Sequence, residues 1–371
     1  MKPAFEVGKI LQQHIHELPN IINNSWKRRT LYALAKCRTS ALGGHIDRCD
    51  NPKCNKLHLS YNSCRNRHCP KCQSHLQQKW MQERERDLLK TSYFHTIFTL
   101  PDTLNQVALQ EPRLLYGLLF KVAWKVIKDF ASNQKFMGAQ SGMIAVLHTW
   151  GQNLSLHPHL HCIIPGGGLS KSGQWKESKS NGKYLFPVKS MSKVFRAKMV
   201  AALRKQKLLT KQEAQQLFKK NWVIFCKQPF YGPMQVVEYL GRYTHKIAIS
   251  NHRIIDMDND QIRFSAKDYR KGGKKHVVTL KPTEFIRRFA MHILPKGFTR
   301  IRHYGILSGG CKKECKAIID NQIGELEIFI IGSVGIFLAI CPACKKGKLQ
   351  TVAVFDQRGP PLHWLKKLQL H

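Results

Sequence analysis

The sequence has few acidic residues. Its 371 residues include 23 aspartates and glutamates against 61 lysines and arginines, which gives a formal net charge of +38 at pH 7. A protein with so large a basic excess attracts polyanions, because each phosphate that it neutralises releases bound counterions. The composition therefore favours a nucleic-acid partner, with a ribosome-associated protein or a merely basic surface as the alternatives.

Long apolar runs are also lacking. The first residues, Met1 to Val7, contain no apolar signal core, and the longest apolar candidate, 328–341, is shorter than a membrane span. We therefore expect a protein of the bacterial cytosol, associated with the nucleoid, with no membrane partner. The sequence also has no internal repeat, no low-complexity tract and no P-loop motif, and the missing P-loop disfavours a fused helicase.

Cysteine, by contrast, is frequent. The chain has 12 cysteines, and in a basic cytosolic protein they indicate metal ligation before disulfides. Cys37 and Cys64 could form a metal site with His45 or His68, or remain as spare thiols. Four other cysteines have a spacing close to that of a zinc ribbon, for which free buried cysteines are a poor explanation, and we expect them to bind a structural zinc ion: Cys49-x4-Cys54-x14-Cys69-x2-Cys72.

Basic residues lie between these cysteines. Arg65, Arg67 and Lys71 suit phosphate contacts, so we interpret the module as DNA-binding, with a structural metal. The C-terminal region contains two further pairs, Cys311-x3-Cys315 and Cys341-x2-Cys344. The second pair resembles a zinc knuckle, but the spacing of the first pair is irregular, which leaves a zinc ribbon in this region open.

Hydrophobic periodicity predicts both helices and strands, with an exposed hairpin tip at 170–181. Stripes of apolar residues predict two helical segments within 4–36, a charged connector helix at 77–90, and helices at 111–133, 190–206, 211–219 and 283–294. Runs rich in β-branched and aromatic residues predict strands at 94–100, 143–148, 162–164, 223–226, 247–250, 253–255, 261–265 and 277–280.

Two histidines enclose one apolar residue in His159-Leu160-His161. On a strand, residues two apart share a face, so both imidazoles would point the same way and could hold a divalent metal ion. Taken alone, such a pair is more often an ordinary surface or hydrogen-bonded pair. A third protein ligand is expected, for which Gln152 and His157 compete. Imidazole and amide ligands suit Mg²⁺ or Mn²⁺, with water and substrate phosphate completing the shell.

Two tyrosines stand four residues apart in the predicted helix 233–246. Tyr239 and Tyr243 would project from one helix face, where such a pair is by itself more often a packing pair. Cleavage of a phosphodiester needs a nucleophile, and tyrosine can form a covalent phosphotyrosine that retains the bond energy for rejoining. Arg242 and Lys246 lie on the same helix and could contact phosphates.

These motifs in this order resemble the two-tyrosine, IS91-like branch of the rolling-circle transposases, which belong to the HUH (histidine–hydrophobic–histidine) nuclease superfamily. The resemblance covers about residues 30–305, and the C-terminal sixty or so residues match less well. The matching motifs are Ser63-Cys-Arg-Asn-Arg-His-Cys-Pro-Lys-Cys-Gln73, Phe98-Thr-Leu-Pro101, His157-Pro-His-Leu-His161, Tyr239-Leu-Gly-Arg-Tyr-Thr-His245, Ile247-Ala-Ile-Ser-Asn251, Phe285-Ile-Arg-Arg-Phe289 and Arg302-His-Tyr-Gly305.

The resemblance implies an α+β fold with an antiparallel-sheet nuclease core, in which His159 and His161 bind the metal beside a helix bearing the tyrosines. We expect a zinc-binding domain at 1–90, the nuclease domain at 91–305, and a region with a second zinc knuckle at 306–371. The implied activity is cleavage of single-stranded DNA at insertion-sequence ends through a 5′-phosphotyrosine, followed by strand transfer into target DNA. A replication initiator, a relaxase and a non-catalytic zinc-dependent nucleic-acid-binding protein remain the alternatives.

Overall fold

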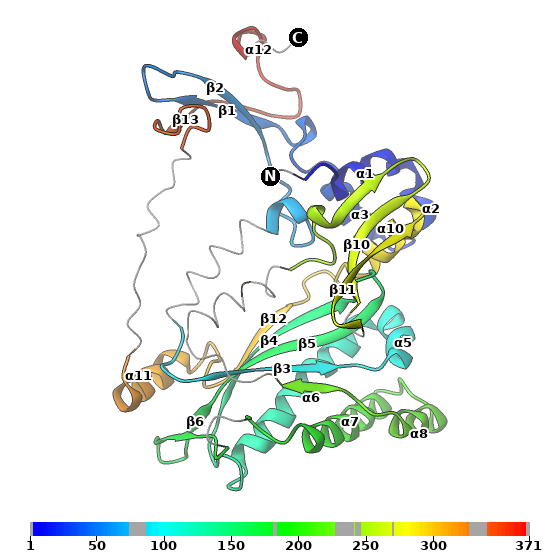
Figure 1. Ribbon diagram of the computed structural model, residues 1–371, viewed down its shortest axis with the longest axis vertical. Helices are drawn as coiled ribbons and strands as arrows, with labels where there is room; N and C mark the ends of the chain where they lie inside the picture. Colours follow the sequence, from blue (N-terminus) through cyan, green and yellow to red (C-terminus); the bar gives the residue numbers. More distant parts are fainter. Residues whose placement is uncertain are drawn as a thin grey trace.

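The computed structural model (Figure 1) describes residues 3–73, 87–180, 184–226, 241, 246–268, 271–325 and 340–368. Tyr239, Arg242 and Tyr243 lie outside these residues, as do most of the expected connector helix 77–90 and most of 233–246. No helix among the described residues is long and apolar enough to cross a membrane.

The centre of the fold is a five-stranded sheet with the order β12-β4-β5-β3-β8. Every neighbouring pair in it is antiparallel, which confirms the expected α+β fold with an antiparallel core. The expected strands at 94–100, 143–148 and 223–226 are confirmed, and the strand around 162–164 begins earlier. The strands are β3 (Tyr93–Thr99), β4 (Gly142–Trp150), β5 (Leu156–Pro165), β8 (Ile224–Cys226) and β12 (Ile301–Gly305).

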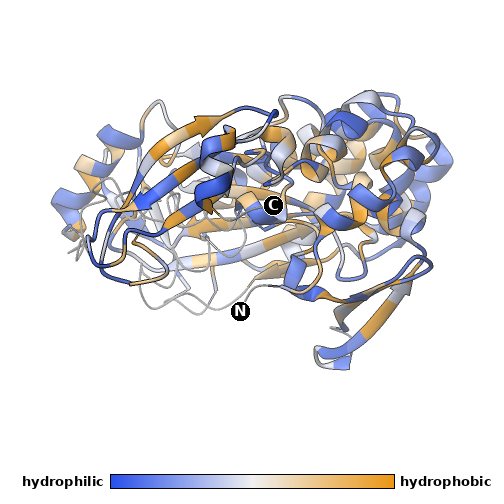
Figure 2. Cartoon of the chain, turned by 90° about the horizontal axis from the view of Figure 1, so that it is seen from above, coloured by the Kyte–Doolittle hydropathy of each residue, from blue (hydrophilic) through white to orange (hydrophobic). Residues whose placement is uncertain are grey.

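Helices cover one face of this sheet. Phe98 of β3 and Leu160 of β5 are fully buried in the core beneath them, and the Phe98 ring meets Phe195 edge to face at 5.0 Å. Because side chains alternate along a strand, the residues between these apolar positions face the other way. Figure 2 shows polar and apolar faces on the helices, as expected for such a layer. The helices of this part are α5 (Asn105–Gln110), α6 (Pro112–Ser132), α7 (Val188–Lys205) and α8 (Lys211–Lys219).

A second core joins the N-terminal helices to a distant part of the chain. Leu31 of α3, Phe264 of β10 and Phe285 of α10 are all fully buried in it. The run 247–250 forms no strand, and instead buries Ala248 and Ile249 in this core. The elements are α1 (Val7–Gln13), α2 (Leu18–Ile21), α3 (Ser25–Ala35), β9 (Ile254–Met257), β10 (Ile262–Asp268), β11 (Lys274–Leu280) and α10 (Pro282–Met291).

A small sheet brings the two ends of the chain together (Figure 1). Its order is β13-β1-β2, and β13 (Leu349–Phe355) pairs antiparallel with β1 (Gly44–Cys49). β2 (Leu57–Tyr61) lies on the other side of β1. The remaining elements are the hairpin β6 (Gly167–Leu169) and β7 (Trp175–Glu177), helices α11 (Lys312–Ile323) and α12 (Leu362–Leu368), and the 3-10 turns η1 (Ile15–Glu17), η2 (Ser40–Leu42), η3 (Asp102–Leu104) and η4 (Asn251–Arg253).

Candidate functional site

Three histidines meet on the face of the sheet opposite to the one that helices α6 and α7 cover. His159 and His161 lie on this face of β5, because Leu156 and Leu160, which occupy the alternate positions of the strand, point into the helical core. The neighbouring strand β4 places His148 directly opposite His159. The nitrogens that His148, His159 and His161 can offer to a metal ion all lie within 4.8 Å of one another.

His148 was not among the ligands expected from the sequence. The sequence contained the information needed to find it, because β4 and β5 are consecutive antiparallel strands joined by a short turn. His148 precedes that turn by about as many residues as His159 follows it. Two residues placed in this way face each other across an antiparallel pair. His157 lies outside the three-histidine group, and its side chain is exposed.

Hydrogen bonds orient the two histidines of β5. The Nδ1–H of His159 donates to the carbonyl oxygen of His157 at 2.6 Å, which leaves the lone pair of its Nε2 free to ligate. That Nε2 lies 3.2 Å from Nε2 of His161. On its other side, Nδ1 of His161 lies 2.9 Å from Nε2 of the buried His95 on β3. Such contacts fix the tautomer and the ring orientation of metal-ligating histidines.

The surroundings keep these imidazoles neutral. Burial lowers the pKa of His159 to about 4. Burial also lowers the pKa of His161 well below its usual value, and the nearby His148 acts in the same direction. A neutral imidazole is the form that binds metals. The group therefore offers nitrogen lone pairs at neutral pH.

The histidines open into a basic cleft with a volume of about 960 Å³. Gln152 and Lys246, two of the residues singled out from the sequence, both line it. Burial lowers the pKa of Lys246, and the positive charges of Arg253 and Lys267 add to this effect. A cleft with this charge suits a phosphate backbone. Its lining residues include His95, Thr99, Trp150, His157, Phe225, Lys267, Asp268 and His276.

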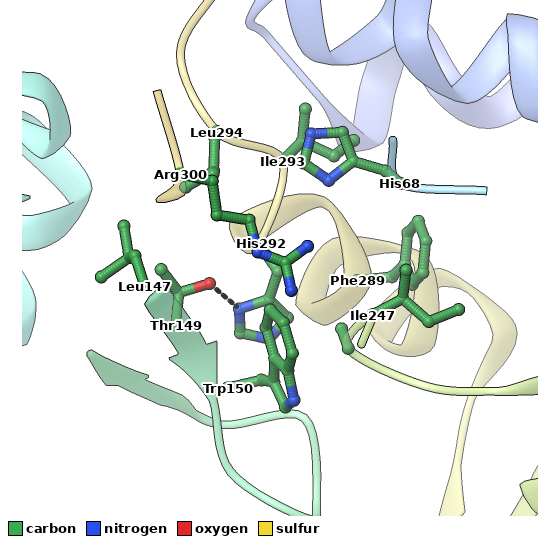
Figure 3. Close-up of a pocket in the computed structure, with 11 residues that line it drawn as sticks. His68, Leu147, Thr149, Trp150, Ile247, Phe289, His292, Ile293, Leu294 and Arg300 are labelled. Atoms are coloured by element: carbon green, nitrogen blue, oxygen red, sulfur yellow. Dashed lines mark hydrogen bonds between the residues drawn. The ribbon is translucent and has the colours of Figure 1, made fainter. Parts of the chain in front are cut away.

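Packed side chains around the end of β4 support that strand end (Figure 3). The indole of Trp150 stacks on the ring of His148 with a centroid distance of 4.5 Å. The guanidinium of Arg300 lies 5.4 Å from the Trp150 ring centroid. Oγ1 of Thr149 lies 3.2 Å from Nδ1 of His292, the contact drawn in Figure 3. His148 is therefore held by a packed and hydrogen-bonded strand end.

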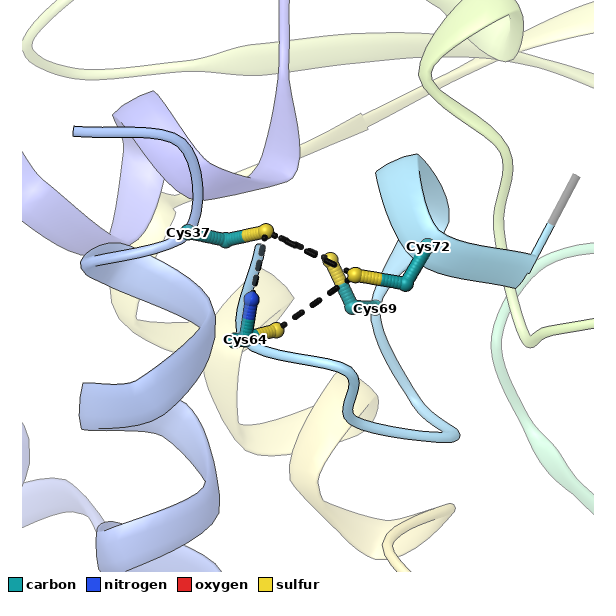
Figure 4. Close-up of side chains that lie close together, drawn as sticks. All are labelled: Cys37, Cys64, Cys69 and Cys72. Atoms are coloured by element: carbon teal, nitrogen blue, oxygen red, sulfur yellow. Dashed lines mark hydrogen bonds between the residues drawn. The ribbon is translucent and has the colours of Figure 1, made fainter. Parts of the chain in front are cut away.

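Four cysteines converge beside helix α3 (Figure 4). The Sγ of Cys37 lies 3.5 Å from that of Cys69 and 3.6 Å from that of Cys72, which lies 3.7 Å from Cys64. Sulfur atoms bound at about 2.3 Å to one tetrahedral zinc ion lie about 3.8 Å apart. Hydrogen bonds from the thiols of Cys64 and Cys69 lower the pKa of Cys37 to about 7. The geometry fits a four-thiolate zinc site.

This cysteine cluster also positions a basic side chain against the part of the molecule that carries the five-stranded sheet. Arg67, in the turn between Cys64 and Cys69, donates from Nη2 to the carbonyl oxygen of Pro295 at 3.2 Å. Its Nη1 donates to the carbonyl oxygen of Phe298. Both acceptors lie in the loop that leads into β12, so the cluster anchors that loop.

The expected grouping of the cysteines needs correction. Spacing placed Cys49 and Cys54 with Cys69 and Cys72, but the structure separates the two pairs. Cys69 and Cys72 lie against the end of α3, where Cys37 and Cys64 complete their group. Cys49 ends β1 and Cys54 lies in the turn after it, and the pairing of β1 with β13 brings a different pair of thiols to them, Cys341 and Cys344.

Cys311 and Cys315 belong to neither group in the part of the chain that the structure describes. The Sγ of Cys311 lies 3.2 Å from Oγ of Ser308 and 3.2 Å from the carbonyl oxygen of Gly305. Cys315 packs against the apolar cluster around Leu88 and Ile319. A ribbon built from the C-terminal pairs alone, which the sequence left open, is therefore not what the described residues form.

Comparison with known proteins gives two family matches. A family described as "Putative transposase" matches residues 142–315, and a "Transposase zinc-binding domain" matches residues 10–100. "Putative transposase y4qJ" of Sinorhizobium fredii is 40% identical over 370 residues, which cover 91% of this chain and 92% of that protein. The transposase for insertion sequence element IS801 of Pseudomonas savastanoi is 28% identical over 295 residues, covering 75% and 70%. No solved structure matches.

Proposed function

We propose, from the premise that this chain belongs to the IS91-like transposases with an N-terminal zinc-binding domain, that it cleaves and rejoins single-stranded DNA at the ends of an insertion sequence. Its substrate as a transposase is DNA. The observation that carries the finer proposal is the convergence of three histidines at a basic cleft. The same arrangement favours a catalytic protein over a binding module, because a binding module needs no such group.

His148, His159 and His161 would hold the divalent metal ion through ring nitrogens. The distance of 3.2 Å between the Nε2 atoms of His159 and His161 suits two adjacent ligands of one ion. Bound there, the ion would polarise the scissile phosphate. Of the two metals expected from the sequence, Mn²⁺ suits an all-imidazole set better than Mg²⁺, which prefers oxygen ligands. Gln152 lines the same cleft and could add an amide oxygen.

Tyr239 and Tyr243 would supply the nucleophiles. The phenolic oxygen of one tyrosine loses its proton to water and attacks the phosphorus, so that a new O–P bond forms and the P–O3′ bond breaks. The DNA 5′ end is then linked to the enzyme, and the leaving oxygen takes up a proton as a free 3′-OH. The second tyrosine permits a further cleavage, and attack by the 3′-OH reverses the step and rejoins the strands.

Phosphates of the bound strand would lie against the basic side of the cleft. Lys246 and Lys267 both line it, and Asp268 is the only acidic residue among its described lining residues. Arg242, on the same segment as the tyrosines, would add a further positive charge. Contacts of this kind position the backbone without reading its sequence.

The proposal is tested with labelled single-stranded DNA carrying the element's ends. In the presence of Mn²⁺, the full-length protein should form a DNA adduct that survives denaturation, and a chelator should abolish it. A protein that binds this DNA but forms no adduct with either metal would be the non-catalytic alternative. A replication initiator or relaxase would give the adduct as well, but would cleave at a plasmid origin rather than at insertion-sequence ends.

His95 is expected to act as a positioning residue through His161. If the metal binds at Nε2 of His161, then Nδ1–H donates to His95, at the observed 2.9 Å. His95→Ala should lower adduct formation by roughly 10- to 100-fold. The Mn²⁺ concentration for half-maximal activity should rise, and His95→Gln, which keeps a hydrogen-bonding group, should recover part of the loss. An unchanged Mn²⁺ dependence in His95→Ala would contradict this role.

A further inference from the structure

A second group of four cysteines joins the two ends of the chain. The Sγ of Cys49 lies 3.6 Å from that of Cys344, 295 residues away. The Sγ of Cys54 lies 3.9 Å from that of Cys341, 287 residues away. All four are free thiols. The zinc-binding domain match ends at residue 100, so it does not include the C-terminal pair.

The distances and the donors around these thiols fit a tetrahedral metal site. Sulfur atoms around one zinc ion lie about 3.8 Å apart, close to both observed values. The backbone N–H of Gly347 donates to Sγ of Cys344 at 3.3 Å, and Nε2 of His58 lies 3.3 Å from Sγ of Cys341. Donors of this kind stabilise thiolates in zinc knuckles.

Residue 347 must be glycine, because its backbone packs directly against the thiols of the group. Its backbone N–H contacts Cys344, and its carbonyl oxygen accepts a hydrogen bond from the N–H of Cys341 at 2.7 Å. A Cβ atom at this position would lie 2.3 Å from Sγ of Cys49. Any larger residue must therefore displace a thiol from the group.

The sheet that carries these cysteines has little apolar core of its own. Ile46 and Phe355 are buried, but most residues of β2 and β13 are half-buried or exposed, and Val354 is 74% exposed. Small sheets without a hydrophobic layer are marginal in water, and a structural metal commonly supplies the missing stability. The pairing of β13 with β1 therefore needs a further source of stability.

We propose that Cys49, Cys54, Cys341 and Cys344 bind a second structural Zn²⁺, which ties the C-terminal segment 340–355 to the N-terminal sheet. The site takes two thiolates from each end of the chain, so it forms only when the whole chain is present. It is separate from the group of Cys37, Cys64, Cys69 and Cys72, which lies wholly within the N-terminal part.

The test is the zinc content of the purified full-length protein. Measurements are made in a His159→Ala/His161→Ala background, so that the histidine group does not add to the count. The parent should contain two zinc ions per chain, and Cys341→Ser/Cys344→Ser should contain one. Cys311→Ser/Cys315→Ser, a matched pair outside both groups, should keep two. One zinc ion in the parent, or two in Cys341→Ser/Cys344→Ser, overturns the proposal.

A glycine variant tests the zinc site without removing any thiol, and a second glycine variant controls for general effects on folding. Gly347→Ala retains every cysteine but should lose one zinc ion and expose the segment 340–355 to protease. Gly310→Ala, whose added Cβ would meet nothing within 4 Å, is the control and should keep two. Full zinc occupancy and protease resistance in Gly347→Ala contradict the geometry. Disulfides between the two pairs, revealed by a thiol count four short of 12 under non-reducing conditions, would also exclude the zinc site.

Discussion

Replacing His148 with alanine should lower the rate of adduct formation by at least about 100-fold, because it would remove one of the three ligands of the proposed metal site. The residue is buried behind the stacked ring of Trp150, and its neighbours are held by hydrogen bonds. We therefore expect the fold to survive the change while the affinity for Mn²⁺ falls. The measurement is the initial rate of adduct formation across a Mn²⁺ titration.

Two further variants serve as a control for His148→Ala and as a test of an alternative ligand. His252→Ala removes an exposed histidine outside the group and should leave the rate unchanged. Gln152→Ala tests Gln152, the amide ligand considered from the sequence, against His148 as the third ligand, because both residues line the cleft. If Gln152→Ala abolishes Mn²⁺ dependence while His148→Ala behaves like the wild type, the three-histidine site is wrong.

The double variant Tyr239→Phe/Tyr243→Phe should lower adduct formation by at least about 1,000-fold, to below detection, because no phenolic oxygen remains to attack the phosphate. Phenylalanine keeps the ring, so a pair that only packs would tolerate the change. Binding of the same DNA should be nearly unaffected, which a gel-shift assay can measure. Tyr184→Phe, at a half-exposed tyrosine outside the cleft, is the matched control.

The parts of the site that depend on local spacing could be predicted from the sequence. Side chains alternate along a strand, so His159 and His161 share one face wherever that strand lies. The apolar Leu160 between them indicates that the opposite face is the buried one. The strands at 94–100 and 143–148 followed from the same local signals. The antiparallel sheet came from the family resemblance, and the pairing of β3, β4 and β5 confirms it.

Contacts between distant segments could not be predicted in this way. The role of His148 depends on the register between β4 and β5, and the cysteine groups depend on the return of β13 to β1. The spacing along the chain suggests that Cys54 and Cys69 share a site. It does not show that Cys341, far away in the sequence, lies closer to Cys54 in space. The core that the N-terminal helices share with Phe264 and Phe285 is likewise a contact between distant segments, so local patterns did not predict it.

The division into units at 1–90, 91–305 and 306–371 stays a prediction. The second core links helices α1 and α3 to α10, and the small sheet links β1 to β13, so packing crosses both boundaries. A unit that shares its core with another exposes apolar surface when it is cut out. We therefore expect activity to need the whole chain.

The most direct test of the proposed chemistry is to identify the residue that carries the DNA. The adduct formed with Mn²⁺ would be digested with a protease and a nuclease, and the peptide bearing the remaining nucleotide would be sequenced by mass spectrometry. We predict a phosphodiester on Tyr239 or Tyr243. A nucleotide attached to any other residue, or cleaved DNA with no protein attached, would contradict the tyrosine mechanism.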